Sequence, residues 1–264
     1  MDMASVGQLF RLDGKSILVT GAGGAIGQAI SVGMAASGGR IACLDVDASK
    51  AEATAAEVRK LGRESLALPL DVRDSRASEQ AVEQVVSAFG SIDVLVNLAG
   101  KAVLKPATDY NESEWDHMAT MYLRSTFLFC TAAGRRMLQQ GSGSIINISS
   151  VASLVALGRG TSAYAAMKAG VNGLTRELAL EWAAKGVRVN AIAPCQVDTP
   201  QLRAMLVDPR FDSERLMDTW LSYIPMKRLG SPQELVGPCL FLASEAASLV
   251  TGHVLVVDGG YTIH

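Results

Sequence analysis

The chain has 264 residues, of which 49% are hydrophobic and 19% charged, a composition that excludes a disordered chain. Its 24 lysines and arginines nearly balance its 26 aspartates and glutamates, so it lacks the basic field that a nucleic-acid or anionic-membrane partner needs. Its three histidines have no metal-ligand spacing and its four cysteines form no CxxC pair, so we expect no metal and free thiols. Because residues 1–10 have neither a basic nor an apolar export region, we expect a cytoplasmic protein.

Short apolar runs alternate with longer amphipathic stretches along the chain, and several runs lack the polar alternation of a half-exposed strand. Helical periodicity predicts helices at Ala48–Leu61, Ser75–Phe89, Asn111–Gln140 and Ser162–Ala184. We therefore predict a single α/β domain over residues 1–264, with a Rossmann-like, doubly wound parallel sheet of about seven strands and helices on both faces. The predicted strands are Ser16–Thr20, Arg40–Leu44, Ser65–Leu70, Ile92–Val96, Ser144–Ser149, Val187–Ala193 and His253–Val257.

Residues from Pro194 to about Pro232 form a long stretch without a clear period, with five prolines spread through it. An irregular connection of this length is usually a functional lid, so we predict a substrate-binding flap around residues 195–225. Its polar side chains can bind a hydroxylated or anionic small molecule, or can equally form a solvated helix face. They are Gln201, Arg203, Arg210, Asp212, Arg215 and Trp220.

The first predicted strand leads directly into a glycine cluster, Thr20–Gly27, and a helical pattern follows at once. Glycines at this place allow a tight turn, a close approach of the backbone to a pyrophosphate and close packing of helix on strand. The N–H groups at the start of the helix then face the phosphates. The cluster therefore predicts dinucleotide binding rather than a structural turn.

The carboxylate of Asp45 lies at the end of the second predicted strand, 18 residues after Gly27. There it can accept hydrogen bonds from both ribose hydroxyls, and it would repel a 2′-phosphate. The next residue, Val46, supplies no positive charge. We therefore predict NAD rather than NADP; the alternative is a solvated aspartate at a strand end.

A serine, a tyrosine and a lysine form a third group. Ser150 follows the fifth predicted strand, and Tyr164 and Lys168 open a predicted helix four residues apart, on one helical face. A free tyrosine titrates near 10, and a neighbouring ammonium favours the phenolate. We therefore predict that Tyr164 is an acid–base catalyst with a lowered pKa, and that Ser150 holds the substrate oxygen beside it.

Together these features resemble the short-chain dehydrogenase/reductase family, and the resemblance covers nearly the whole chain. The glycine cluster matches the motif T-G-x-x-x-[GA]-x-G, with Ala25 at its variable position, and Asn97–Gly100 matches N-x-A-G. Ser150, Tyr164 and Lys168 match the catalytic residues. The resemblance implies these coenzyme contacts: Gly21, Gly23, Ala25, Ile26, Gly27, Asp45, Asp71, Val72, Asn97, Ala99, Gly100, Tyr164, Lys168, Val197 and Thr199.

The resemblance implies an NAD-dependent oxidoreductase that interconverts a secondary alcohol and a ketone on a small molecule, and the polar flap favours a sugar, polyol or hydroxy compound. One alternative is an NADPH-dependent 3-oxoacyl thioester reductase, which Asp45 disfavours. The other is a weakly catalytic NAD-binding scaffold or sensor. It is motivated by Tyr122, which stands where the family often has an asparagine. Tyr122 could hold a water through its phenol or pack in the core.

The predicted helices 111–140 and 162–184 carry apolar residues on more than one face, and such helices need a second surface to bury. The family resemblance also implies dimers or tetramers built on these helices. We therefore expect a homotetramer or homodimer. The residues that suggest it are Met118, Leu123, Phe127, Val171 and Leu174.

Overall fold

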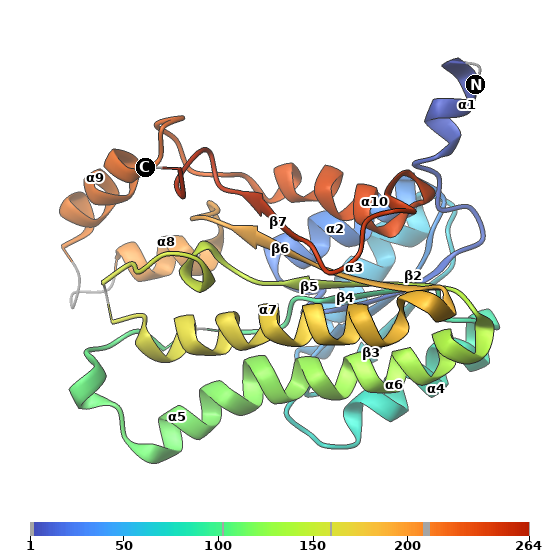
Figure 1. Ribbon diagram of the computed structural model, residues 1–264, viewed down its shortest axis with the longest axis horizontal. Helices are drawn as coiled ribbons and strands as arrows, with labels where there is room; N and C mark the ends of the chain where they lie inside the picture. The colour runs from blue at the N-terminus through green and yellow to red at the C-terminus, as the bar shows by residue number, and fades with distance from the viewer. Residues whose placement is uncertain (1–2, 102, 159, 208–211, 264) are drawn as a thin grey trace.

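The computed structural model describes residues 3–101, 103–158, 160–207 and 212–263. At its centre is a parallel sheet of seven strands in the order β3-β2-β1-β4-β5-β6-β7 (Figure 1). This confirms the predicted sheet, and each predicted strand overlaps an observed one. The strands are β1 (Ser16–Thr20), β2 (Arg40–Asp45), β3 (Ser65–Pro69), β4 (Val94–Asn97), β5 (Gly143–Ile148), β6 (Val187–Pro194) and β7 (Val254–Val257).

Helices cover both faces of the sheet (Figure 1). The helices α4, α6 and α7 pack on one face, and α2, α3 and α10 pack on the other. The α-helices are α1 (Met3–Gln8), α2 (Ala25–Ala36), α3 (Ala48–Lys60), α4 (Ala77–Phe89), α5 (Glu112–Met118), α6 (Ser125–Gln140), α7 (Ser162–Trp182), α8 (Pro200–Leu206), α9 (Ser213–Tyr223) and α10 (Val236–Ala243). Short 3₁₀ turns lie at Ala107–Asp109, Val151–Ser153, Ala183–Lys185, Pro232–Leu235 and Glu245–Ala247.

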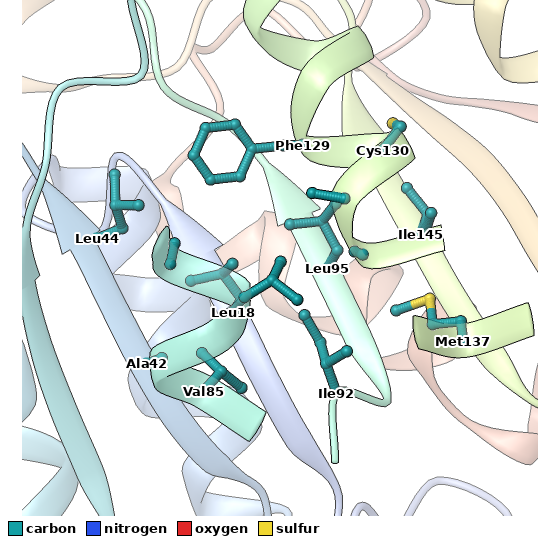
Figure 2. Close-up of a cluster of buried hydrophobic side chains, with 14 of the residues drawn as sticks. Leu18, Ala42, Leu44, Val85, Ile92, Leu95, Phe129, Cys130, Met137 and Ile145 are labelled. Carbon is teal, nitrogen blue, oxygen red and sulfur yellow. The ribbon is translucent and has the colours of Figure 1, made fainter. Parts of the chain in front are cut away.

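The apolar strand residues build a core on each side of the sheet. Figure 2 shows one of them, where Leu18 of β1 and Leu95 of β4 meet Val85 of α4 and Phe129 of α6. Because successive strand residues point to opposite faces, neighbours of these residues on the same strands fill the second core. The sheet is therefore held rigidly from both sides, which fixes the positions of the loops at its edges. No helix in the described ranges is long and apolar enough to cross a membrane.

The segment predicted as one helix over 111–140 is interrupted. Helix α5 passes into a π-helical segment, η2 (Ala119–Arg124), and then into α6. A π-helical turn inside an α-helix inserts an extra residue, and such turns are frequent at functional sites. Hydrophobic periodicity does not reveal this insertion, because the apolar stripe continues on both sides of it.

The described part of the segment between β6 and α10 contains two helices, α8 and α9. This is consistent with the helix face that the polar residues of the predicted flap left open, although the spread of prolines hides the helical period. Thr199 caps α8 with its hydroxyl, and Asp212 caps α9 with its carboxylate. The predicted flap therefore has a definite scaffold, although Arg210 lies outside the described residues.

Candidate active site

The predicted site residues gather where the strands end. In a parallel sheet the carboxyl ends of all strands meet at one edge, and ligands bind where the strand order reverses. Here it reverses at β1, since the chain runs outward through β2 and β3 and then returns to β4 on the other side. The glycine cluster follows β1, and the 97–100 segment follows β4.

A threonine ties these two loops together. The Thr20 hydroxyl oxygen accepts hydrogen bonds from the backbone N–H groups of Leu98, at 3.0 Å, and Ala99, at 3.2 Å. The first glycine of the cluster, Gly21, packs directly against Ala99. The predicted coenzyme contacts from the two loops, including Gly100, are therefore neighbours in space.

The glycine loop leaves the backbone N–H groups at the start of α2 without side-chain partners. A Cβ on Gly27 would overlap the carbonyl oxygen of Gly21 and lie 2.8 Å from Ala22 Cα, so only glycine fits there. The residue before the helix, Gly24, supplies no side-chain cap to α2. The first-turn N–H groups, which include those of Ala25 and Ile26, therefore have no capping side chain and can bind an anion.

Asp45 lies beside this loop, half-buried at the end of β2. One carboxylate oxygen accepts the N–H of Gly23 at 3.0 Å, and the other accepts the N–H of Asp47, also at 3.0 Å. Each oxygen keeps a second lone pair for a ligand hydroxyl. An uncapped helix start with a carboxylate beside it fits the diphosphate and ribose of a dinucleotide.

Three further predicted coenzyme contacts have side chains that are already paired or buried within the protein. The Asp71 carboxylate forms a bidentate pair with Arg73, which holds the pKa of that carboxyl below its usual value. Val72 is buried in the core. The Asn97 amide donates to the Asn147 side-chain oxygen at 2.9 Å, so it is directed into the sheet.

Ser150, Tyr164 and Lys168 come together at the end of β5. Ser150 and Lys168 are buried, and a hydrogen bond joins the Ser150 hydroxyl to the Tyr164 phenol. The Lys168 ammonium nitrogen lies 5.7 Å from the centroid of the Tyr164 ring and donates to the Ile148 carbonyl at 2.6 Å. Helix α7 thus places the tyrosine and the lysine on the side facing the strand end, as the four-residue spacing predicts.

The electrostatics of this trio differ from the prediction. Burial raises the pKa of Tyr164 above its ordinary value, and the hydrogen bond from Ser150 only partly opposes that rise. Burial also lowers the pKa of Lys168 to about 7. The predicted lowering of the Tyr164 pKa is therefore wrong for the chain alone, because the desolvation of the buried phenol outweighs the interaction that favours the phenolate.

The residues after β6 are engaged in local structure. Val197 is buried and pairs with Gly230 in an isolated bridge. The Thr199 hydroxyl accepts the N–H of Leu202 at 3.1 Å, and its own proton remains free to donate. Two of the polar flap residues support local structure: Arg203 pairs with Asp198, and Asp212 caps α9.

Sequence reasoning missed a polar network behind the trio. The Asn172 amide donates to the Ser153 hydroxyl at 2.8 Å, and that hydroxyl donates to the Ser150 carbonyl at 2.5 Å. The Asn147 amide likewise donates to the Thr175 hydroxyl at 3.0 Å. A signal was available, because Lys168, Asn172 and Thr175 recur at helical spacing on the buried side of α7.

The fold and this strand edge define a nucleotide-binding α/β oxidoreductase. A family model described as "Enoyl-(Acyl carrier protein) reductase" matches residues 21–262. The chain belongs to the short-chain dehydrogenase/reductase family. It is an oxidoreductase that acts on a CH–OH group, interconverting alcohol and ketone, with a nicotinamide dinucleotide as coenzyme.

The similarity to characterised relatives extends over the full length. The chain is 43% identical over 254 residues to D-threitol dehydrogenase of Mycolicibacterium smegmatis, covering 96% of this chain and 95% of that one. It is 40% identical over 257 residues to galactitol 2-dehydrogenase (L-tagatose-forming) of Cereibacter sphaeroides, covering 97% and 98%. A gluconate 5-dehydrogenase from Burkholderia cenocepacia, solved with NADP and tartrate, superposes with a TM-score of 0.90 at 34% identity, covering 98% and 99%.

Proposed function

We propose that the chain interconverts a secondary alcohol of a sugar or polyol and the corresponding ketone, using NAD. The observation that carries the proposal is the Ser150–Tyr164 hydrogen bond, beside Lys168 and at the same sheet edge as the glycine loop and Asp45. The substrate class is supported by the relatives, whose names specify a four-carbon and a six-carbon polyol.

In this proposal Tyr164 exchanges the proton of the carbinol oxygen, and Ser150 orients that oxygen by a hydrogen bond. The coenzyme, when bound, supplies the site that accepts or donates the hydride. Lys168 supports the phenolate form of Tyr164 and contacts the coenzyme ribose. Because burial raises the pKa of Tyr164, the phenol is protonated at neutral pH and ready to donate to a ketone. We therefore expect alcohol oxidation to accelerate as the pH rises, whereas ketone reduction should be efficient at neutral pH.

The preference for NAD rests on Asp45. Its carboxylate lies at hydrogen-bond distance from the glycine loop, where a 2′-phosphate would meet a negative charge. The coenzyme contacts inferred from the sequence, from Gly21 to Thr199, remain part of this proposal. Since a relative was solved with NADP, the turnover with NAD and with NADP has to be compared.

A single assay tests both the substrate class and the coenzyme. Purified protein is mixed with NAD or NADP and a panel of threitol, galactitol, other polyols, hydroxy acids and cyclic alcohols, and reduced coenzyme is followed by absorbance. We expect turnover with a polyol and NAD. A parallel reaction contains a 3-oxoacyl thioester and NADPH, and loss of NADPH there without turnover of any polyol would favour the thioester reductase. Tight NAD binding without any turnover would favour the scaffold or sensor.

We also propose that the chain forms a homodimer or homotetramer through α5, α6 and α7. Of the residues that suggested this, Met118 and Val171 are buried in the core, whereas the side chain of Phe127 is 47% exposed. Leu180 on α7 is 81% exposed and adds to the apolar surface. Light scattering should give a dimer or tetramer that Leu180→Glu dissociates. Leu61→Glu, at the exposed residue that follows α3 on the opposite face of the sheet, should not dissociate it. A monomeric wild-type protein would contradict this.

Two further parts of the proposal concern organisation. Residues 1–264 act as one domain, with residues 195–225 as its substrate flap; the support is that β6 leads directly into α8 and α9 at the site edge. A cytoplasmic location is supported by the four free cysteines, which suit a reducing compartment.

A further inference from the structure

Tyr122 lies in the π-helical segment η2, which packs against α7. The hydroxyls of Ser125 and Thr126 donate to the carbonyls of Met121 and Tyr122, each at 2.6 Å. These bonds satisfy backbone acceptors in the widened turn. The segment is therefore well supported, and the side chain it presents has a fixed position.

The Tyr122 ring is buried and fills the space between a loop and the trio. On one side, a Cβ on Gly100 would overlap its Cε1 atom and lie 2.8 Å from its Cζ atom. On the other side, its ring meets that of Tyr164 edge to face, with centroids 5.3 Å apart and an interplanar angle of 80°. Gly100 is thus needed here because Tyr122 occupies the room that a side chain would take.

The same ring faces Lys168. The ammonium nitrogen lies 4.7 Å from the Tyr122 ring centroid, closer than its 5.7 Å from the Tyr164 ring. Its hydrogen bond runs to the Ile148 carbonyl, and within the described ranges no carboxylate forms an ion pair with it. A buried ammonium without a counter-ion is stabilised by a carbonyl dipole and by aromatic faces.

We propose that Tyr122 is a positioning residue of the active site, whose ring face holds the Lys168 ammonium in its charged form beside Tyr164 and excludes water from the α5–α6 side. This inference rests on the proposed function for its catalytic meaning. It adds a third role to the two interpretations of Tyr122 from the sequence, because it concerns the ring face and not the phenol oxygen. The groups that face Lys168 are then Tyr122 from η2, Tyr164 from α7 and the Ile148 carbonyl from β5.

The test measures Lys168 directly in the coenzyme-free protein. Lysine labelled with ¹³C at the ε-carbon is incorporated, the chemical shifts are titrated from pH 5 to 10, and the Lys168 signal is assigned by its loss in Lys168→Met. Tyr122→Phe keeps the ring face and should leave the titration near that of the wild type. Tyr122→Leu keeps an apolar side chain but removes the face, and it should lower the Lys168 pKa by about one unit, a tenfold loss of proton affinity.

A series that keeps the shape of the side chain guards against misfolding. Phenylalanines with one, two and three ring fluorines are installed at position 122, because fluorine weakens the negative face while barely changing the volume. The Lys168 pKa should fall stepwise with each fluorine. The matched control is Tyr110→Leu. Tyr110 packs against the same cluster as Tyr122, but its ring faces the Lys105 ammonium and not that of Lys168. This substitution should leave the pKa of Lys168 unchanged.

The outcomes separate this inference from the proposed function. A Lys168 pKa that stays constant across the fluorinated series overturns the role of Tyr122, even if the protein turns over polyols. A stepwise fall in a protein that turns over no alcohol upholds the contact between Tyr122 and Lys168 and rejects the proposed reaction. In an active protein, the pH profile of kcat/KM for polyol oxidation should shift in Tyr122→Leu but not in Tyr122→Phe.

Discussion

The two halves of the candidate active site depend on different physical effects. Around β1 and β2 the site depends on missing side chains, because glycines leave room for a ligand and expose helix N–H groups. Around β5 and α7 it depends on buried titratable groups whose pKa values are moved by desolvation. The first region should therefore be sensitive to volume, and the second to charge and to solvent access.

The substitution Tyr164→Phe should have the largest effect and should change the chemistry without changing coenzyme binding. The phenol is the group that we expect to exchange the substrate proton, and general acid–base catalysis contributes roughly 10²- to 10⁴-fold. Turnover of a polyol should fall by about that factor, while the dissociation constant for NAD, measured by fluorescence titration, should change little. Full activity in this variant would remove Tyr164 from the reaction.

The substitution Gly27→Ala should affect the other region, the glycine loop that we expect to bind the coenzyme. The added Cβ overlaps the Gly21 carbonyl oxygen, so the loop must shift, at a cost of about 3 kcal/mol in unfolding free energy. Coenzyme binding should weaken with it. The matched control is Gly24→Ala, whose Cβ would lie 3.5 Å from the same oxygen, at ordinary contact distance. Denaturant unfolding should show little loss for the control; equal losses in both variants would contradict the steric argument.

The volume-dependent region could be predicted more reliably from the sequence than the charge-dependent region. Glycine spacing and the position of Asp45 can be interpreted locally, because a tight turn and a strand end are local structures. The pKa values of Tyr164 and Lys168 depend on how deeply distant elements bury them, and four-residue spacing contains no information on that. The π-helical segment at Tyr122 could not be predicted, since it depends on tertiary contacts rather than on periodicity. Helices α8 and α9 begin at the local caps Thr199 and Asp212, but their number and bounds could not be predicted from a stretch without a clear period.

A smaller effect concerns pH and stability. Because the folded pKa of Lys168 is about 7, below its ordinary value of 10.5, the unfolded chain binds one more proton between these values. The stability of the coenzyme-free protein should therefore rise with pH in that window, by up to about 1.4 kcal/mol per pH unit from this residue alone.

The measurement compares urea unfolding of the wild type and Lys168→Met between pH 7.5 and 9.5, so that other groups cancel. The wild type should gain stability relative to the variant as the pH rises. Lys185→Met, at an exposed position after α7, serves as control and should follow the wild type. A constant difference between the wild type and Lys168→Met would show that the Lys168 pKa is not lowered.

The smallest effect is expected outside both regions, on the flap surface. Arg203 forms an exposed pair with Asp198, and such pairs contribute little. Arg203→Ala should leave the melting temperature and the KM for a polyol close to those of the wild type. A large rise in KM would instead make this arginine a substrate contact and enlarge the site toward α8.

The most direct test of the proposed reaction follows hydrogen itself. Galactitol and threitol carrying deuterium on every carbon are incubated with the protein and NAD, and the reduced coenzyme is analysed by mass spectrometry. We predict that the coenzyme gains one deuterium from the carbinol carbon, with the carbinol proton passing to Tyr164. Reduced coenzyme that contains only solvent hydrogen, or no reduction with any polyol, would contradict the proposal.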